Sequence, residues 1–447
     1  MSSLKNLAIR GGMWIVGGYG LSQIIRLGSN LILTRLLIPE LFGLMALVNV
    51  FLQGLELFSD VGIRPNIVRN PKGEEPQFYN TAWTIQIIRG FILWLLCFII
   101  AAPASQIYDE PRLLWLIPVV GLTTVIRGFK STSMDLLSRR LEIGKSTRFQ
   151  ITNQIISLTI TVVWAWFHRS IWALVVANLL GALLLSIRSH SLTNDPPNRL
   201  AWNLEARQEI FSFGKWIFIS TAMTFLANQA DQLLLGKLLG IGSLGVYSIA
   251  RIFTELPMQI VQRLSNGVAF PTIVKKLDLP RHELREKILE KRKLLLLFAV
   301  GIITIFASFG DLVILFLYDE RYTEASWMLP LLTLGIWPIL LARTMEQVLI
   351  GMGKPYYNAA GYFLKFLYMI TLLPFAYQLA GNVGAIIAVA FNDIPYYSII
   401  SFGLWKEKIN TLRQDILMTF LLIVAIISIV GVRYSLGAGL PISQLIT

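Results

Sequence analysis

The sequence predicts an all-α, polytopic membrane protein with about 12 to 14 transmembrane helices. Of its 447 residues, 55% are hydrophobic and only 15% are charged, whereas a soluble domain carries about 25% charged residues. The mean hydropathy is +0.63. Apolar runs of about 20 residues, the length that crosses a bilayer as a helix, recur almost from one end of the chain to the other. This composition excludes a cytosolic enzyme with a single membrane tether.

Six apolar runs in the first half predict six membrane-spanning helices. They lie near residues 10–33, 41–63, 79–103, 113–138, 148–167 and 170–188. No small-residue cleavage site follows the first run, so we expect a retained span rather than a signal peptide. The fifth and sixth runs are separated only by the short segment 167–170.

Seven further runs follow in the second half. They lie near residues 211–236, 243–272, 293–317, 325–350, 356–378, 382–404 and 414–434. We expect a cytoplasmic linker between the halves because the segment before residue 211 is polar and contains Pro196 and Pro197, which favour turns. The predicted parts are an N-terminal six-helix lobe (1–190), the linker (191–209), a C-terminal six-helix lobe (210–405) and an accessory C-terminal helix with its tail (406–447).

The net charge of +13 results from 39 Lys and Arg against 26 Asp and Glu. In a polytopic protein such an excess usually lies in cytoplasmic loops, and most loop cations here fall on the side of the N-terminus. We therefore predict a cytoplasmic N-terminus and no nucleic-acid partner. The longest loops on the other side, 105–112 and 318–324, are too short for a folded domain.

An internal repeat is indicated by residues 31–43, which align without gaps on residues 233–245. The alignment places Arg35 on Lys237 and Gly43 on Gly245. Each copy joins the first and second span of its half. Because an even number of spans separates the copies, the two lobes are expected to be parallel.

Few residues of the chain suit metal binding or catalysis. The single cysteine, Cys97, lies in an apolar stretch, so no internal disulfide is expected. The three histidines are scattered among predicted loops, and we expect no metal site. Residues 240–245 match a dinucleotide fingerprint only by sequence, since they lie in a short turn between two spans with no strand before them, and residues 144–147 resemble only the end of a P-loop. No metalloprotease motif or nucleophile elbow is present.

Basic residues inside the predicted spans are the most informative feature of the sequence. Each costs about 2.5 to 3.5 kcal/mol at the centre of a lipid-facing helix, so most must face an aqueous cavity or a partner. For Arg251 and Arg343, an acidic residue lies three or four positions away, and a local ion pair and a cavity role are equally consistent. The predicted substrate-binding cations are Arg26, Arg89, Arg127, Arg251, Arg343 and Lys365.

Acidic residues are fewer inside the spans. Asp60 and Asp231 are candidates for coupling-ion or gating residues, and each could equally serve as an internal salt-bridge partner. A predominantly basic cavity suits an anionic headgroup, because guanidinium groups match phosphate oxygens bidentately. A cavity for a cationic drug would instead be expected to present unpaired carboxylates.

Four stretches carry a resemblance to a known family. They are residues 33–44 (LTRLLIPELFGL), 60–63 (DVGI), 230–240 (ADQLLLGKLLG) and 244–248 (LGVYS). In these stretches the chain resembles the Wzx-type polysaccharide flippases, the polysaccharide transporter branch of the multidrug/oligosaccharidyl-lipid/polysaccharide exporter superfamily. The resemblance extends over residues 1 to about 430. It implies a MATE-like fold with two six-helix lobes around a central cavity, followed by accessory C-terminal helices.

The function that this resemblance implies is translocation of polyprenyl-pyrophosphate-linked oligosaccharide repeat units across the bacterial inner membrane by alternating access. The units would reach the outer leaflet for synthesis of O-antigen (lipopolysaccharide), capsule or exopolysaccharide. Expected partners are this lipid-linked substrate, membrane lipids, and the polymerase and ligase of the same pathway. No cofactor is expected, and coupling to protons or to sodium stays open.

Three other functions remain. The first is a multidrug or cation exporter of the same superfamily, which the basic lining disfavours. The second is an integral-membrane glycan polymerase or ligase, which the short outer loops disfavour. The third is a membrane scaffold that transports nothing.

Overall fold

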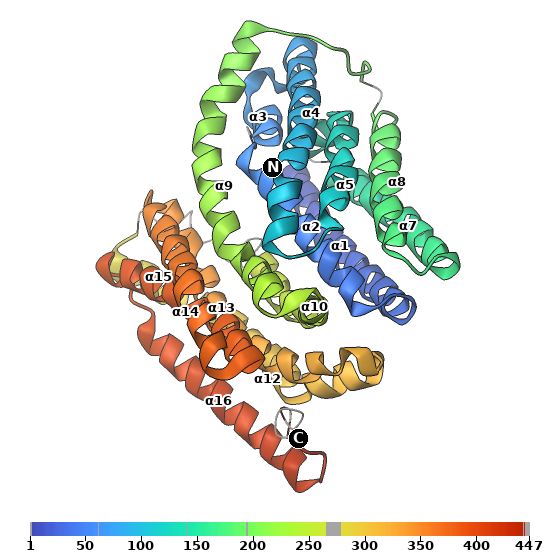
Figure 1. The fold of residues 1–447 in the computed structure, drawn as a ribbon. Helices are drawn as coiled ribbons and strands as arrows, with labels where there is room; N and C mark the ends of the chain where they lie inside the picture. Colours follow the sequence, from blue (N-terminus) through green and yellow to red (C-terminus); the bar gives the residue numbers. More distant parts are fainter. Residues whose placement is uncertain are drawn as a thin grey trace. The chain divides into compact units, whose positions relative to one another are not determined.

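The computed structural model describes residues 2–60, 62–140, 142–193, 195–264, 279–440 and 442. Within these residues every regular element is a helix and none is a strand (Figure 1). The chain divides into two compact units, Met1–Phe225 and Leu226–Thr447. The predicted all-α class is confirmed. The division falls inside a helix, and the predicted lobe boundaries at 190, 209 and 405 stay predictions.

The first unit contains the first six predicted spans and the beginning of the seventh. Its elements are α1 (Ser2–Leu36), α2 (Pro39–Phe58), α3 (Ile63–Arg69), η1 (Pro71–Glu74), α4 (Pro76–Ile107), α5 (Leu113–Gly128), α6 (Ser133–Arg139), α7 (Ile143–Phe167), α8 (Ile171–Ser189) and the first part of α9 (Leu204–Leu238). The fourth predicted run is not one straight helix, because α5 and α6 meet at 58°. Helix α9 begins at Leu204, inside the predicted linker.

The second unit contains the remaining helices. They are the end of α9, α10 (Gly240–Leu264), α12 (Arg281–Leu317), η3 (Glu320–Tyr322), α13 (Glu324–Gly351), α14 (Tyr356–Ala390), α15 (Ile394–Lys406) and α16 (Leu412–Ser435). Helix α14 is broken at Ala380 and Gly381, where Gly381 has a φ of 55°, a conformation that favours glycine. This break coincides with the predicted boundary between the runs 356–378 and 382–404.

Seven helices of the described chain are long and apolar enough to cross a membrane, or up to eight if the bent pair α5–α6 is one span. Every predicted run coincides with a helix or with consecutive helices, although the run 243–272 continues into residues outside those described. Four long helices, α1, α7, α9 and α10, are not among these candidate spans, which comprise described residues alone. Three of these, α1, α9 and α10, carry the candidate residues Arg26, Asp231 and Arg251.

Helix packing within each unit supports the internal repeat. In the first unit α5 packs against α2, α4 and α8, and α7 packs against α8. In the second unit α13 packs against α10, α12 and α15, and α14 packs against α15. These partners recur in the same order along the chain, so the two units share much of their packing plan, although α1·α7 of the first unit and α13·α14 of the second have no counterpart of similar extent among the described residues.

Helix α16 is attached to α12 by two buried ion pairs. Arg292 pairs with Asp415 at 2.5 Å, and Asp311 pairs with Arg433 at 2.5 Å. Arg433 is therefore a buried structural residue. The two positions on α12 are separated by about 28 Å at 1.5 Å per residue, close to the hydrocarbon thickness of about 30 Å. Each pair therefore fixes one end of the apolar segment of α16.

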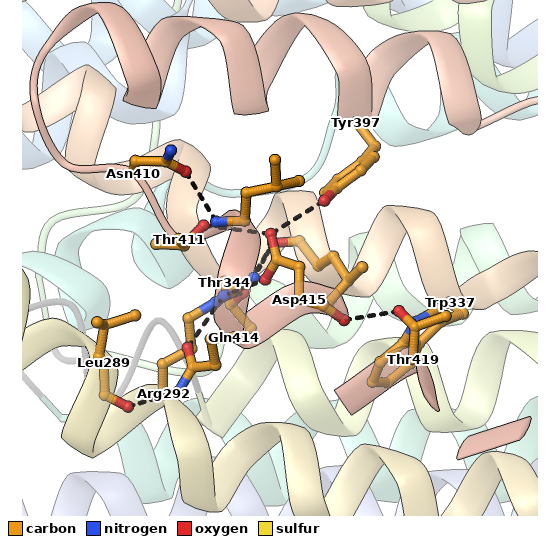
Figure 2. A network of polar contacts seen from close by, with 12 residues as sticks. Leu289, Arg292, Trp337, Thr344, Tyr397, Asn410, Thr411, Gln414, Asp415 and Thr419 are labelled. Carbon is orange, nitrogen blue, oxygen red and sulfur yellow. Dashed lines mark hydrogen bonds and ion pairs between the residues drawn. The ribbon is translucent and has the colours of Figure 1, made fainter. Parts of the chain in front are cut away.

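Hydrogen bonds complete the first of these pairs, as Figure 2 shows. Tyr397 and Thr411 both donate to Asp415, at 3.0 and 3.2 Å. Arg292 donates to the Thr344 hydroxyl at 2.8 Å and to the Gln414 amide oxygen at 3.1 Å. A buried ion pair is stable only when its remaining polar atoms are satisfied in this way.

We predict opposite effects of alanine at two helical glycines of the second unit. A Cβ atom at Gly335 would lie 1.8 Å from the backbone oxygen of Ala390, whereas a Cβ atom at Gly301 would contact nothing within 4 Å. Gly335→Ala should lower the melting temperature and the yield of folded protein, because helix backbones would have to separate. Gly301→Ala should be neutral or stabilising by up to about 1 kcal/mol, since alanine favours helix. Thermal unfolding in detergent measures both, and equal melting temperatures would contradict the packing.

Candidate functional site

A polar cavity of about 300 Å³ lies in the first unit, where α2 ends and where α5 gives way to α6. The chain turns after α2 through Gly62, which adopts a left-handed conformation at φ 67°. The cavity is lined by polar and ionisable residues from four helices and two breaks, including Asp60, Arg64, Gln86, Arg89, Lys130, Asp135, Ser138, Ser146 and Gln150.

Side-chain hydrogen bonds hold the bend that shapes this cavity. The Gln86 amide donates to the backbone oxygens of Gly128 and Lys130, at 2.9 and 3.0 Å. From the other side, Asn198 of the segment before α9 donates to the Thr132 hydroxyl at 2.9 Å. The Ser131 hydroxyl donates to the Asn198 amide oxygen at 2.7 Å. The Gln86 bonds satisfy backbone oxygens that the break between α5 and α6 exposes, and the Asn198 bonds hold the side chains of the break.

Arg89 and Lys130 line the cavity without a carboxylate at ion-pair distance in the described part of the chain. The Nε group of Arg89 donates to the Ser59 hydroxyl at 2.8 Å, and Nη2 donates to the backbone oxygen of Glu56 at 2.5 Å. These partners are neutral. The carboxylates of Asp60 and Glu56 interact electrostatically with Arg89 but form no direct ion pair with it.

Arg26 lies on α1 in the same unit and has even fewer partners. Its Nε and Nη2 atoms are buried, and neither has a hydrogen-bond partner among the described residues. Arg127 differs, because its side chain is 52% exposed and pairs with Glu56 at 3.3 Å. Asp60 lines the cavity and accepts a hydrogen bond from the backbone N–H of Gly62 at 2.8 Å.

A second cavity, of about 230 Å³, lies within the second unit. Helices α9, α10, α13 and α14 surround it, together with the turn that follows α14. Its ionisable lining consists of Asp231, Arg251, Glu255, Arg343, Lys365 and Asp393, and its neutral polar lining of Asn228, Tyr247, Thr254 and Asn392. Three carboxylates therefore face three cations.

Arg251 joins two of these carboxylates. Its Nη1 atom lies 2.9 Å from Asp231, and its Nε group donates to Glu255 at 3.2 Å. The Tyr247 hydroxyl also donates to Asp231, at 2.5 Å. The expected local pair with Glu255 is present. Of the two roles considered for Asp231, the salt-bridge partner is the one that this geometry displays.

The other two cations of this cavity are also paired. Lys365 lies 2.6 Å from Asp393, and these side chains are 7% and 14% exposed. Arg343 lies 3.6 Å from Glu346, which in turn accepts a hydrogen bond from Tyr396. Sequence reasoning missed the partner of Lys365 because Asp393 follows the break in α14, which folds the chain back.

The six predicted cations therefore fall into two groups, and Arg127 belongs to the paired group because it contacts Glu56 in the first unit. Arg251, Arg343 and Lys365 each contact a carboxylate in the second unit. Arg26 and Arg89 in the first unit do not, and Lys130 shares this property. Excess positive charge within the spans consequently belongs to the first unit. The second cavity is also lined by three residues that were not predicted from the sequence, namely Asn228, Tyr247 and Asn392. They are neutral, and no pattern in the sequence distinguishes them from other polar residues.

Residues 32–327 match the model of a family described as "Polysaccharide biosynthesis protein". A relative in Rhizobium meliloti (strain 1021), "Succinoglycan biosynthesis transport protein ExoT", is 24% identical over 54% of this chain and 48% of its own length. The chain thus spans about half of that protein. "Lipopolysaccharide biosynthesis protein WzxC" of Escherichia coli (strain K12) is 23% identical over 97% of this chain and 88% of its own length.

Solved structures share the fold. The chain superimposes on "Lipid II flippase MurJ, inward closed conformation" with a TM-score of 0.63 and 13% identity, covering 93% of this chain and 92% of that one. An inward-facing multidrug resistance MATE family transporter gives a TM-score of 0.60 at 14% identity, with 93% and 96% covered. The MATE-like fold that the resemblance implies is confirmed.

We predict that neutralising paired and unpaired cations has different effects on stability. Lys365→Met leaves Asp393 buried without its counter-charge, which should destabilise the protein by about 3 to 5 kcal/mol. Arg26→Gln leaves no carboxylate unpaired, so its melting temperature should be unchanged or higher. The double variant Lys365→Met/Asp393→Asn should recover part of the loss. Thermal unfolding measures all three, and equal stability of the two single variants would contradict the assigned pairing.

Proposed function

This chain belongs to the polysaccharide biosynthesis protein family, and from that premise we propose that it is a flippase rather than an enzyme. Its substrate is a polyprenyl-diphosphate-linked oligosaccharide, which it moves from the cytoplasmic to the outer leaflet of the bacterial inner membrane by alternating access. The N-terminus is cytoplasmic. The surface polysaccharide is then assembled by a polymerase and a ligase on the outer side.

The observation that carries this proposal is the uncompensated positive charge of the first unit. Arg26, Arg89 and Lys130 lie in or beside membrane-spanning helices and have no carboxylate partner among the described residues. Such cations are expensive to keep and usually mark a functional site. A diphosphate supplies several anionic oxygens, and guanidinium groups bind such oxygens bidentately.

A cationic drug fits this unit less well than an anion does. It would meet Arg89 and Lys130 on the cavity wall, where Asp60 and Asp135 are the lining acids. Asp135 is also 3.8 Å from Arg64. The balance of charge therefore favours an anionic substrate over export of a cation.

Membrane energetics agree with this direction of transport. An inside-negative potential helps to expel an anion by about 2.3 kcal/mol per charge for each 100 mV. The polyprenyl tail stays in the bilayer, so only the diphosphate and the glycan need a polar environment. Protons or sodium ions can supply further driving force, with Asp60 on the cavity wall as the candidate residue.

The double variant Arg26→Gln/Arg89→Gln tests the proposal. We expect its flipping rate to fall about 100-fold or more, because each lost charge-assisted contact is worth about 1.5 to 3 kcal/mol. The assay uses proteoliposomes loaded with the lipid-linked oligosaccharide fraction from cells depleted of this protein. Transfer is scored by an impermeant glycosidase added outside.

Two matched variants control this experiment. Arg413→Gln removes an exposed cation and should leave the rate unchanged. Arg26→Lys/Arg89→Lys keeps the charges but loses the guanidinium geometry, and should retain part of the activity. Wild-type flipping by a well-folded Arg26→Gln/Arg89→Gln protein would refute the assigned role of these cations.

A further inference from the structure

We propose that the cavity of the second unit is a glycan subsite, which binds sugar hydroxyl and acetamido groups of the transported molecule and excludes its diphosphate. This inference rests on the proposed function and divides the substrate between the units. The first unit binds the anion through uncompensated cations, and the second unit binds the neutral, polar saccharide.

Internal neutralisation of the cavity argues against a second phosphate site. Arg251 is held between Asp231 and Glu255, and Lys365 contacts Asp393 at 2.6 Å. A diphosphate that entered would have to displace these carboxylates from their cations. The displaced carboxylates would then be buried without a counter-charge, which is strongly unfavourable.

The same pairs leave no vacant place for a small cation. Asp231 already contacts the Arg251 guanidinium at 2.9 Å and accepts a hydrogen bond from Tyr247 at 2.5 Å. Asp393 already contacts the Lys365 ammonium. Protein cations thus occupy the positions that a coupling ion would take at these two acids.

Unsatisfied hydrogen-bonding capacity is what remains for a ligand. The Nε group of Arg343 is buried and has no hydrogen-bond partner among the described residues. The side-chain amide of Asn392 lines the cavity and likewise forms no hydrogen bond within the described part of the chain. One group can donate, and the other can both donate and accept. Sugar hydroxyl and acetamido groups offer the matching acceptors and donors.

The size and the apolar part of the wall also suit a saccharide. A volume of about 230 Å³ is smaller than the drug-sized pockets of about 300 to 1,000 Å³, and it suits a single sugar residue. Met258, Ile336 and Ile339 line the cavity beside its polar groups. A pyranose ring combines an apolar face with polar edges, so it can satisfy both parts of this wall.

Two binding probes test the assignment on the full-length protein in nanodiscs. One is farnesyl diphosphate, which carries the anion without sugar, and the other is the lipid-linked oligosaccharide fraction from cells depleted of this protein. Asn392→Ala should weaken binding of the oligosaccharide lipid about tenfold, the value of one lost hydrogen bond of about 1.4 kcal/mol. Its affinity for farnesyl diphosphate should stay within about twofold of wild type.

A second variant and a control complete the design. Arg343→Gln/Glu346→Gln removes a cation and its carboxylate together, so no buried charge is left unpaired, and it should show the same selective loss. Asn382→Ala replaces an asparagine of α14 outside the cavity lining and should bind both probes like wild type. Arg89→Gln should weaken binding of both probes, because both contain the diphosphate.

The outcomes separate this inference from the proposed function. Equal losses for both probes in Asn392→Ala and in Arg343→Gln/Glu346→Gln would make the cavity a second anion site and overturn the glycan assignment alone. Unchanged binding of both probes, or a change only in sodium dependence, would also overturn it. If wild-type protein binds neither probe, the proposed function fails and the glycan subsite fails with it.

Discussion

A charged side chain that leaves water must be given a counter-charge or a ligand, and this requirement governs how both units are built. Arg292 with Asp415 and Asp311 with Arg433 meet it completely, because each pair is buried and closed by hydrogen bonds or backbone oxygens. These pairs hold α16 to α12. The cations of the second cavity meet the requirement through carboxylates on their own helix, on a neighbouring helix or on the turn after α14. Arg26 and Arg89 have no direct ion pair among the described residues of the first unit, and this exception is where we propose that the anion binds.

The shared packing plan of the units makes the difference in charge more informative. Two halves with corresponding helix contacts place polar cavities within each half, yet cations without a direct ion pair line only the cavity of the first unit. Packing alone would not require this asymmetry. A substrate with an anionic diphosphate and a neutral glycan does require it, since each part needs a different environment. Buried cations without a counter-charge lower the stability of the folded protein, and binding sites commonly trade stability for function in this way.

Hydropathy was sufficient to predict the positions of the long helices, because about 20 apolar residues are needed to cross a bilayer. It could not predict the bends within these helices or the ion-pair partners of their charged residues. The bend between α5 and α6 escaped prediction since Gln86 and Asn198, which stabilise it, are distant in sequence. Helix α9 begins before the predicted apolar run, because its first turns are polar and a search for apolar runs does not detect them. Pairing partners such as Asp393 for Lys365 depend on tertiary contacts that no local spacing reveals. The sequence identified basic residues inside the spans as candidates. Only the tertiary structure showed which of them lack a direct ion pair.

The leaflet location of the lipid-linked oligosaccharide in cells depleted of this protein tests the central claim most directly. A membrane-impermeant probe applied to intact spheroplasts reports which leaflet exposes the glycan. The account predicts that the oligosaccharide accumulates on the cytoplasmic side after depletion and becomes accessible again when the wild-type chain is restored. Normal exposure on the outer side after depletion, with or without unpolymerised units, would contradict it.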